Sequence, residues 1–186
     1  MKCLSIASSI LILTCGMAAA HAETDKTGFY VGGSLGQMQV ELNHGDFDES
    51  GVGFGVYGGY HFNEWFGLES HLFVSGDLDV GNVGVAAASW TFAPKLSYQI
   101  NDTLSVYAKA GAALMAVVFD SAFSDQDFSG QGWTYGVGIN AAVTEHLNLR
   151  LGYDIIKGDM DSKKGWRVKD LDTEISAVTA GLHYQF

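Results

Sequence analysis

A small set of charged residues draws attention because each lies within a stretch of small or apolar residues. The set comprises Glu69, Lys95, Lys109, Arg150 and Asp154. Carboxylates and cationic groups that share a confined space can form ion pairs, transfer protons or line a path for ions. Each of these residues shares its alternate positions mainly with glycine, alanine, serine or threonine. We therefore expect all five side chains on one face of extended strands.

Histidines and a glycine-rich stretch are the other candidates for chemistry. His61, His71 and His183 share the parity of the charged set, but none has a partner at the spacing of metal ligands. We expect polar interior residues there, with no metal and no cofactor. The stretch GVGFGVYGG from Gly51 to Gly59 opens no helix, so a phosphate loop is disfavoured. No nucleophile and base stand in a readable arrangement, and we expect no enzyme.

The elements that must position these residues are strands. Apolar residues alternate with small or polar ones through about eight stretches: 28–41, 52–62, 66–75, 89–100, 104–114, 133–143, 147–155 and 175–186. Tight turns at 63–64, 101–103 and 144–146 separate some of them, and long acidic segments at 42–51, 76–84, 120–130 and 158–172 separate the others. This order predicts an all-β fold, an eight-stranded antiparallel up-and-down β-barrel.

Alternation alone leaves two kinds of barrel open, a soluble lipocalin-like one with its apolar face inside and a transmembrane one with that face outside. Few charges lie in the strand bodies, whereas water-exposed surface is typically about 25–35% charged. The apolar face also ends in aromatic residues. These are Phe29, Phe62, Tyr98 and Tyr184 on the turn side and Trp90 and Trp133 toward the loops. Both observations favour a lipid-facing exterior with interfacial aromatic girdles.

The first residues predict secretion. Met1 and Lys2 precede an apolar run and the sequence Ala20-His21-Ala22, which together form a signal peptide over residues 1–22, followed by a barrel domain over 23–186. A lipoprotein modified at Cys15 is disfavoured because Thr14 is large. Cys3 and Cys15 are the two cysteines and both lie in this leader, so we expect no disulfide. A formal net charge of −11 argues against nucleic acid as a partner.

Three segments resemble the transmembrane domain of OmpA-like outer-membrane proteins: APKLSYQINDTLSVYAKAGAAL (93–114), GVGINAAVTEHLNLRLGYD (136–154) and the final TAGLHYQF. The resemblance covers Gly28 to Phe186. It implies a multi-pass barrel in the Gram-negative outer membrane, in contact with lipids and lipopolysaccharide. It also implies that Tyr184 and Phe186 form a signal read by the outer-membrane assembly machinery. The sequence stops at the barrel, so we expect no peptidoglycan-binding domain, as in OmpX-like or OmpW-like barrels.

The resemblance also bears on the charged set. OmpA-like barrels carry an interior network of glutamate and basic residues proposed to gate a narrow ion path, and the five charged residues match it. Asn140 replaces an inward acid of the family, which leaves Asp154 or Glu69 to serve more than one cation. Lys95 and Lys109 lie on neighbouring strands and need an acid nearby, for which Glu69 is the nearest candidate. We favour a structural plug over a gate because small barrels fill their interior with side chains.

For the whole protein we expect a monomer with a role in envelope integrity or in surface interaction. One alternative is a narrow, porin-like ion channel gated by the network; another is an adhesin or phage-contact protein that binds an extracellular ligand through its loops. The loops hold most of the acid: Asp46, Asp48, Glu49, Asp77, Asp79, Asp120, Asp125, Asp127, Asp159, Asp161, Asp170 and Asp172. The last loop adds Lys163, Lys164, Arg167 and Lys169, which could pair with lipid phosphates. Sequence alone does not rank these roles.

Overall fold

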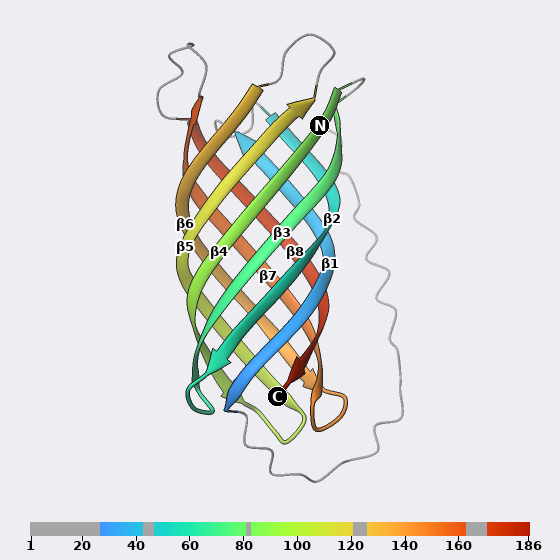
Figure 1. Ribbon diagram of the computed structural model, residues 1–186, viewed down its shortest axis with the longest axis vertical. Coiled ribbons are helices and arrows are strands. Elements are labelled where there is room, and N and C mark those ends of the chain that lie inside the picture. Colours follow the sequence, from blue (N-terminus) through green and yellow to red (C-terminus); the bar gives the residue numbers. More distant parts are fainter. Residues whose placement is uncertain (1–26, 43–46, 81–82, 121–125, 163–170) are drawn as a thin grey trace, which may run out of the picture.

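A computed structural model describes residues 27–42, 47–80, 83–120, 126–162 and 171–186 (Figure 1). They form eight antiparallel strands that pair in chain order and close into one barrel. The strands are β1 (Gly28–Leu42), β2 (Phe47–His61), β3 (Phe66–Val80), β4 (Val83–Gln99), β5 (Leu104–Asp120), β6 (Gln126–Ala142), β7 (Leu147–Ser162) and β8 (Leu171–Gln185). The predicted eight-stranded up-and-down barrel is confirmed.

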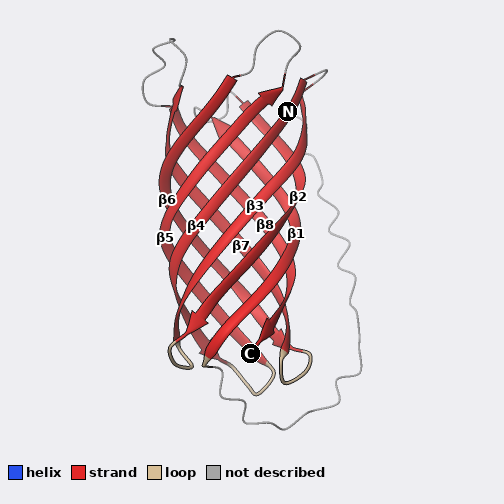
Figure 2. Cartoon of the chain, viewed as in Figure 1, coloured by secondary structure: helices blue, strands red, loops and turns tan. Residues whose placement is uncertain are grey.

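The barrel closes where the first strand meets the last. β1 pairs with β8 from Tyr30 opposite Gln185 to Leu42 opposite Thr173. The amide of Phe186 adds a hydrogen bond of 2.9 Å to the carbonyl of Phe29 at the turn end of this seam. Among the described residues, strands make up the whole barrel wall, as Figure 2 shows, and none forms a helix long and apolar enough to cross a membrane.

Side chains that accept hydrogen bonds from the backbone shape the three tight turns. Asn63 Oδ1 accepts from the amides of Trp65 and Phe66 at 3.1 and 2.7 Å. Asn101 and Thr144 do the same for the second and third turns, each through bonds from residues two and three positions later. These side chains stand in for backbone acceptors, which explains why polar residues end the alternation there. All three turns lie at the end of the barrel that also holds Phe186 (Figure 1).

The strands are longer than the sequence suggested. They run for 15 to 17 residues, whereas about 9–11 residues cross a bilayer at a tilt. β3 and β4 therefore extend through most of 76–84, which was expected to be a loop, and the other three expected loops shrink in the same way. The apolar alternation ends before the strands do, because the backbone ladder needs no apolar side chain and continues beyond it. The expected long loops are thus wrong in extent.

The outer face of the wall has the expected composition. Many large apolar residues on the outer face are more than half exposed, among them Phe29, Phe54, Phe62, Trp90, Phe92, Tyr98, Trp133, Val137, Leu151 and Phe186. An apolar exterior of this extent is suited to lipid and not to water. The signal peptide expected over 1–22 lies outside the described residues, as do Lys163, Lys164, Arg167 and Lys169.

Candidate functional site

The five charged residues of the strand bodies meet inside the barrel. β3 supplies Glu69, β4 supplies Lys95, β5 supplies Lys109, and β7 supplies Arg150 and Asp154. Each occupies an inward position of its strand, and none is more than 8% exposed. Lys95 is fully buried and Glu69 is 1% exposed, so the centre of this group is shielded from solvent. We call the five residues the ionic layer.

Glu69 is the centre of the ionic layer because three cations donate hydrogen bonds to its carboxylate. Arg150 Nη2 lies 2.7 Å from Oε2, Lys95 Nζ lies 3.2 Å from Oε2, and Lys109 Nζ lies 3.0 Å from Oε1. Both carboxylate oxygens are thus used. A buried carboxylate is tolerated when cations and hydrogen bonds replace its lost hydration in this way.

The two inward lysines lie directly opposite each other in the ladder between β4 and β5. Nearby acids offset the repulsion between the two ammonium groups. Both groups contact Glu69, and Lys109 Nζ also lies 2.9 Å from Asp154 Oδ1. Glu69 therefore serves three cations and Asp154 serves one. If all five groups are ionised, the ionic layer carries one positive charge in excess.

Three tyrosines that the sequence did not single out complete the ionic layer. The hydroxyl of Tyr30 donates to Glu69 Oε2 at 2.7 Å and accepts from Lys95 Nζ at 3.2 Å. The guanidinium of Arg150 lies 4.3 Å from the ring centre of Tyr57 and 4.5 Å from that of Tyr107. Aromatic faces attract cations, so these rings help to offset the excess positive charge. Their parity was the available clue, because Tyr57 and Tyr107 alternate with glycine, serine or lysine.

Asn140 occupies the inward position on β6 where the resemblance would place an acid. Its Oδ1 accepts a hydrogen bond of 3.2 Å from Arg150 Nε. The amide holds the guanidinium without adding a negative charge. The replacement leaves Glu69 as the only carboxylate that contacts Arg150 among the described residues.

Glycines on the neighbouring strands make room for the long side chains of the ionic layer. A methyl group at Gly136 would collide with Asp154 Oδ1 and lie 2.6 Å from Lys109 Cε. A methyl group at Gly138 would meet the ring and hydroxyl of Tyr107. These inward glycines are therefore a requirement of the crowded interior and not of a turn or a phosphate loop.

The three inward histidines are spread along the interior. His71 Nε2 lies 3.2 Å from Ser34 Oγ, and His183 Nδ1 lies 3.3 Å from the hydroxyl of Tyr57. His61 stacks beside the ring of Tyr30, with ring centres 4.7 Å apart. Within the part of the chain that is described, no three metal-binding side chains come together. The histidines are polar members of the packed interior.

Toward the loop end, the interior changes from charged to apolar. The sequence predicted an inner face made mostly of small or polar residues, and these large apolar side chains were not singled out. The large inward side chains here are Met38, Val40, Phe73, Met115, Ile156 and Ile175, each at most 4% exposed, and buried hydroxyl residues such as Ser89 and Thr134 lie beside them. We call these six residues the apolar layer. The parity of the sequence could have revealed the apolar layer. Phe73 stands between the inward residues His71 and Ser75, and in β1 the apolar residues shift to the inward positions at Met38 and Val40.

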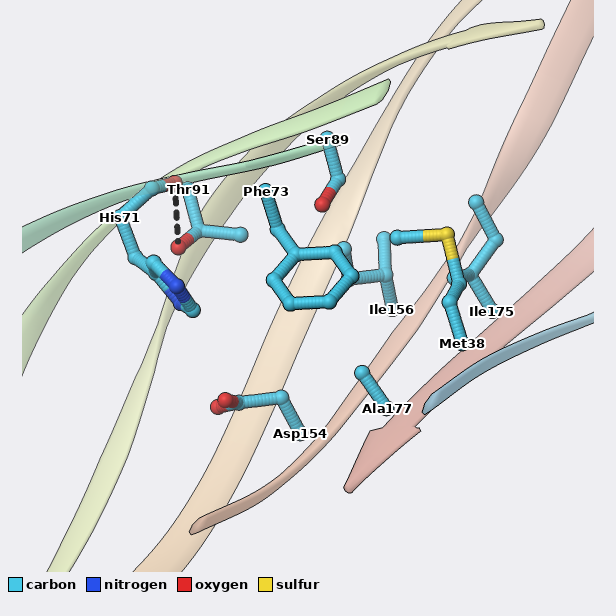
Figure 3. Close-up of a pocket in the computed structure, with 9 residues that line it drawn as sticks. All are labelled: Met38, His71, Phe73, Ser89, Thr91, Asp154, Ile156, Ile175 and Ala177. Atoms are coloured by element: carbon cyan, nitrogen blue, oxygen red, sulfur yellow. Dashed lines mark hydrogen bonds between the residues drawn. The ribbon is translucent and has the colours of Figure 1, made fainter. Parts of the chain in front are cut away.

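A cavity of only about 10 Å³ lies at the junction of the two layers. His71, Thr91 and Asp154 line it on one side of the Phe73 ring, and Met38, Ile156 and Ile175 lie on the other (Figure 3). A volume of this size has room for about one water molecule. At this junction the side chains of the interior are closely packed.

A closed eight-stranded barrel with an apolar exterior and a polar interior core defines the class of small transmembrane β-barrels of the outer membrane. Comparison with known proteins agrees. The chain matches the family model described as outer membrane protein beta-barrel domain over residues 8–186, and it belongs to that family. It is an OmpA-like outer-membrane protein of a Gram-negative cell.

Relatives with known names are of the same kind. A 22 kDa outer membrane protein of Rhizobium leguminosarum bv. viciae is 35% identical over 172 residues, which cover 86% of this chain and 77% of that protein. Outer membrane protein A of Klebsiella aerogenes is 28% identical over 87% of this chain and 50% of its own length. The chain thus spans about half the length of the outer membrane protein A relatives that it matches.

Solved structures share the fold at lower identity. Neisserial surface protein A superposes with a TM-score of 0.72 at 16% identity, covering 86% of this chain and 98% of that one. Ail, the attachment invasion locus protein of Yersinia pestis, superposes with a TM-score of 0.61 at 16% identity, covering 86% and 99%. These likenesses concern the fold alone.

Proposed function

We propose that this protein is a monomeric, non-conducting barrel that strengthens the outer membrane and holds its loops at the cell surface. The observation that carries the proposal is the buried ionic layer, in which Glu69 binds Lys95, Lys109 and Arg150 across the lumen. Such a network ties strands β3, β4, β5 and β7 together and leaves little space for an ion. A plug of this kind gives a rigid scaffold, and rigid scaffolds commonly carry function on their loops.

Lipid and assembly partners follow from the same proposal. The apolar outer face would contact lipid chains, and the acidic loop ends would meet lipopolysaccharide with bridging divalent cations. Tyr184 and Phe186 would be read by the outer-membrane assembly machinery. Both are available on the outer face, where their side chains are 44% and 68% exposed.

A surface ligand is the second candidate function. One solved structure with this fold is Ail in complex with the heparin analogue sucrose octasulfate. A polyanion of that kind is disfavoured here, because this chain has 21 acidic and 10 basic residues. We propose that any ligand of the loops is cationic or is bound through divalent cations.

Conductance measurement separates the proposal from the channel alternative. The purified full-length protein is reconstituted in planar lipid bilayers, with the same detergent and no protein as the control. We expect no current steps above background because both oxygens of Glu69 are occupied by cations. Stable single-channel steps would overturn the non-conducting proposal.

The role in envelope strength is tested by deleting the gene and measuring the sensitivity of the cells to detergent. We expect the sensitivity to rise, and an unchanged sensitivity would contradict this role.

A further inference from the structure

We propose that the apolar layer is a second closure of the lumen, in series with the ionic layer and independent of it. The inference deepens the proposed non-conducting barrel and rests on it. It assigns a function to Phe73, Met115 and their neighbours, which hold no partner in the ionic layer. Opening the ion pairs alone would then leave the barrel closed.

The first step is the position of the apolar layer along the barrel. On β3, Phe73 comes two inward positions after Glu69, on the loop side. The ladder sets Phe73 opposite Ser89 of β4, and Ser89 opposite Met115 of β5. Ile156 lies one inward position beyond Asp154 on β7. Phe73, Met115 and Ile156 therefore lie between the loop end and the ionic layer on their strands.

The second step is how the apolar side chains fill the lumen. A methyl group at Gly53 or Gly55 of β2 would lie 2.6 or 2.8 Å from atoms of the Phe73 ring, so this ring lies against the adjacent strand, where Gly55 is its ladder partner. The methyl end of Met115 likewise lies 2.9 Å from the place of a Cβ at Gly158 of β7. Large side chains on some strands thus pack against glycines on others, which narrows the lumen at this level.

The third step is the chemistry of an apolar constriction. An ion that enters it must give up much of its hydration, because only the hydroxyls of buried residues such as Ser89 and Thr134 are there to replace the water. Apolar constrictions in channels prevent conduction for this reason. The ionic layer blocks ions because its charged groups are already paired with one another. The apolar layer blocks ions because it excludes water. The two barriers would fail under different changes.

Accessibility of a cysteine between the layers tests the proposal directly. Thr91 lines the small cavity, is 5% exposed, and lies opposite His71 in the ladder. Thr91→Cys is made in a full chain in which Cys3 and Cys15 are replaced by serine. Intact cells are treated with a small, cationic, membrane-impermeant thiosulfonate reagent, and the remaining thiols are counted after denaturation. Ser50→Cys, at an exposed position of β2, is the labelled control.

We expect the cysteine of Thr91→Cys to be protected from labelling by the reagent. It should become labelled when Phe73→Ser and Met115→Ser are added. The matched control with Phe73→Leu and Met115→Leu keeps an apolar layer and should stay protected. Folding of each variant is checked by the mobility difference between unboiled and boiled samples. Labelling of Thr91→Cys behind the unchanged apolar layer overturns the proposal. Continued protection in the folded serine variant overturns it too, since another barrier would then be responsible.

Bilayer recording gives the second measurement. Glu69→Gln alone should stay at background, and Glu69→Gln combined with the two serine substitutions should conduct. Conduction by Glu69→Gln alone overturns the inference while the closed wild type still supports the non-conducting barrel. Conduction by the wild type, in contrast, overturns the proposed function itself. The two failures are therefore distinguishable.

Discussion

At the scale of single residues, Glu69 is the group that joins the three cations of the ionic layer. Its carboxylate accepts hydrogen bonds from Tyr30, Lys95, Lys109 and Arg150. Pairs of this kind contribute little when they replace apolar packing, but breaking one by removing a single partner leaves buried charge uncompensated. The contribution of the ionic layer to stability is therefore best measured by removing the Glu69 carboxylate.

Glu69→Ala should lower the free energy of unfolding by about 3–5 kcal/mol, because three buried cations lose their shared partner. Urea titration of the protein in lipid vesicles, followed by the fraction of the folded gel band, measures the change. Glu64→Ala is the matched control, since Glu64 is exposed in the first tight turn and should change stability by at most about 0.5 kcal/mol. Equal effects at the two positions would contradict the central role of Glu69.

Tyr30→Phe tests the aromatic part of the layer. The substitution keeps the ring beside Lys95 and removes only the hydroxyl that donates to Glu69. A hydrogen bond to a charged group contributes about 1.5–3 kcal/mol, so we expect a loss in that range. Tyr98→Phe, at a position 72% exposed on the outer face, should have little effect in the same urea titration. A Tyr30→Phe protein as stable as the wild type would show that the cations alone satisfy Glu69.

Sequence could place these side chains on the inner face but could not pair them. Alternation fixes which way Glu69 and Arg150 point, and a lysine pair on neighbouring strands calls for an acid. The contact between Glu69 and Arg150 joins residues 81 positions apart. It depends on the stagger of eight strands and on the reach of each side chain, which local spacing does not record. Parity placed Tyr57 and Tyr107 on the inner face, but their contacts with Arg150 join distant strands and were not predicted for the same reason.

At the scale of strands and turns, the inward glycines decide how closely the wall can approach the packed interior. Gly136→Ala should destabilise the barrel by about 1–3 kcal/mol, because its methyl group would displace Asp154 and Lys109. Gly33→Ala is the control, since the nearest atom to its Cβ is a carbonyl oxygen 3.7 Å away on the open outer face. Thermal unfolding of the two variants by circular dichroism checks the difference. If the Gly136→Ala protein unfolds at the same temperature as the Gly33→Ala protein, crowding by the added methyl group is refuted.

The strand ends show a different limit of sequence analysis. The tight turns were located because Asn63, Asn101 and Thr144 interrupt the apolar alternation. At the other end the alternation stops before the strands do, and the register between β3 and β4 shifts between Ser75 and Leu78. Such an irregularity changes the parity without a local sequence mark. Strand order and number could therefore be predicted, whereas the extent of the loops could not.

At the scale of the whole molecule, the barrel depends on one seam that joins its first and last strands. In a closed barrel no strand edge is left for pairing with another chain, and this seam is what removes the last edge. Phe186 contributes twice, through its amide bond to Phe29 and through a side chain that packs edge-on against Tyr184 with ring centres 5.1 Å apart. Its side chain is also 68% exposed toward lipid.

Deleting Phe186 should therefore impair membrane insertion more than it lowers the stability of protein that has inserted. The fraction inserted in cells is measured by outer-membrane fractionation and by the mobility difference between unboiled and boiled samples. Phe186→Ala keeps the backbone bond to Phe29 and removes the ring, so it should lower insertion as the deletion does if assembly machinery reads the aromatic group. Phe186→Tyr keeps an aromatic ring and should insert normally. If the alanine variant inserts as well as wild type while the deletion does not, the backbone closure of the seam is what matters, and the proposed assembly signal is wrong.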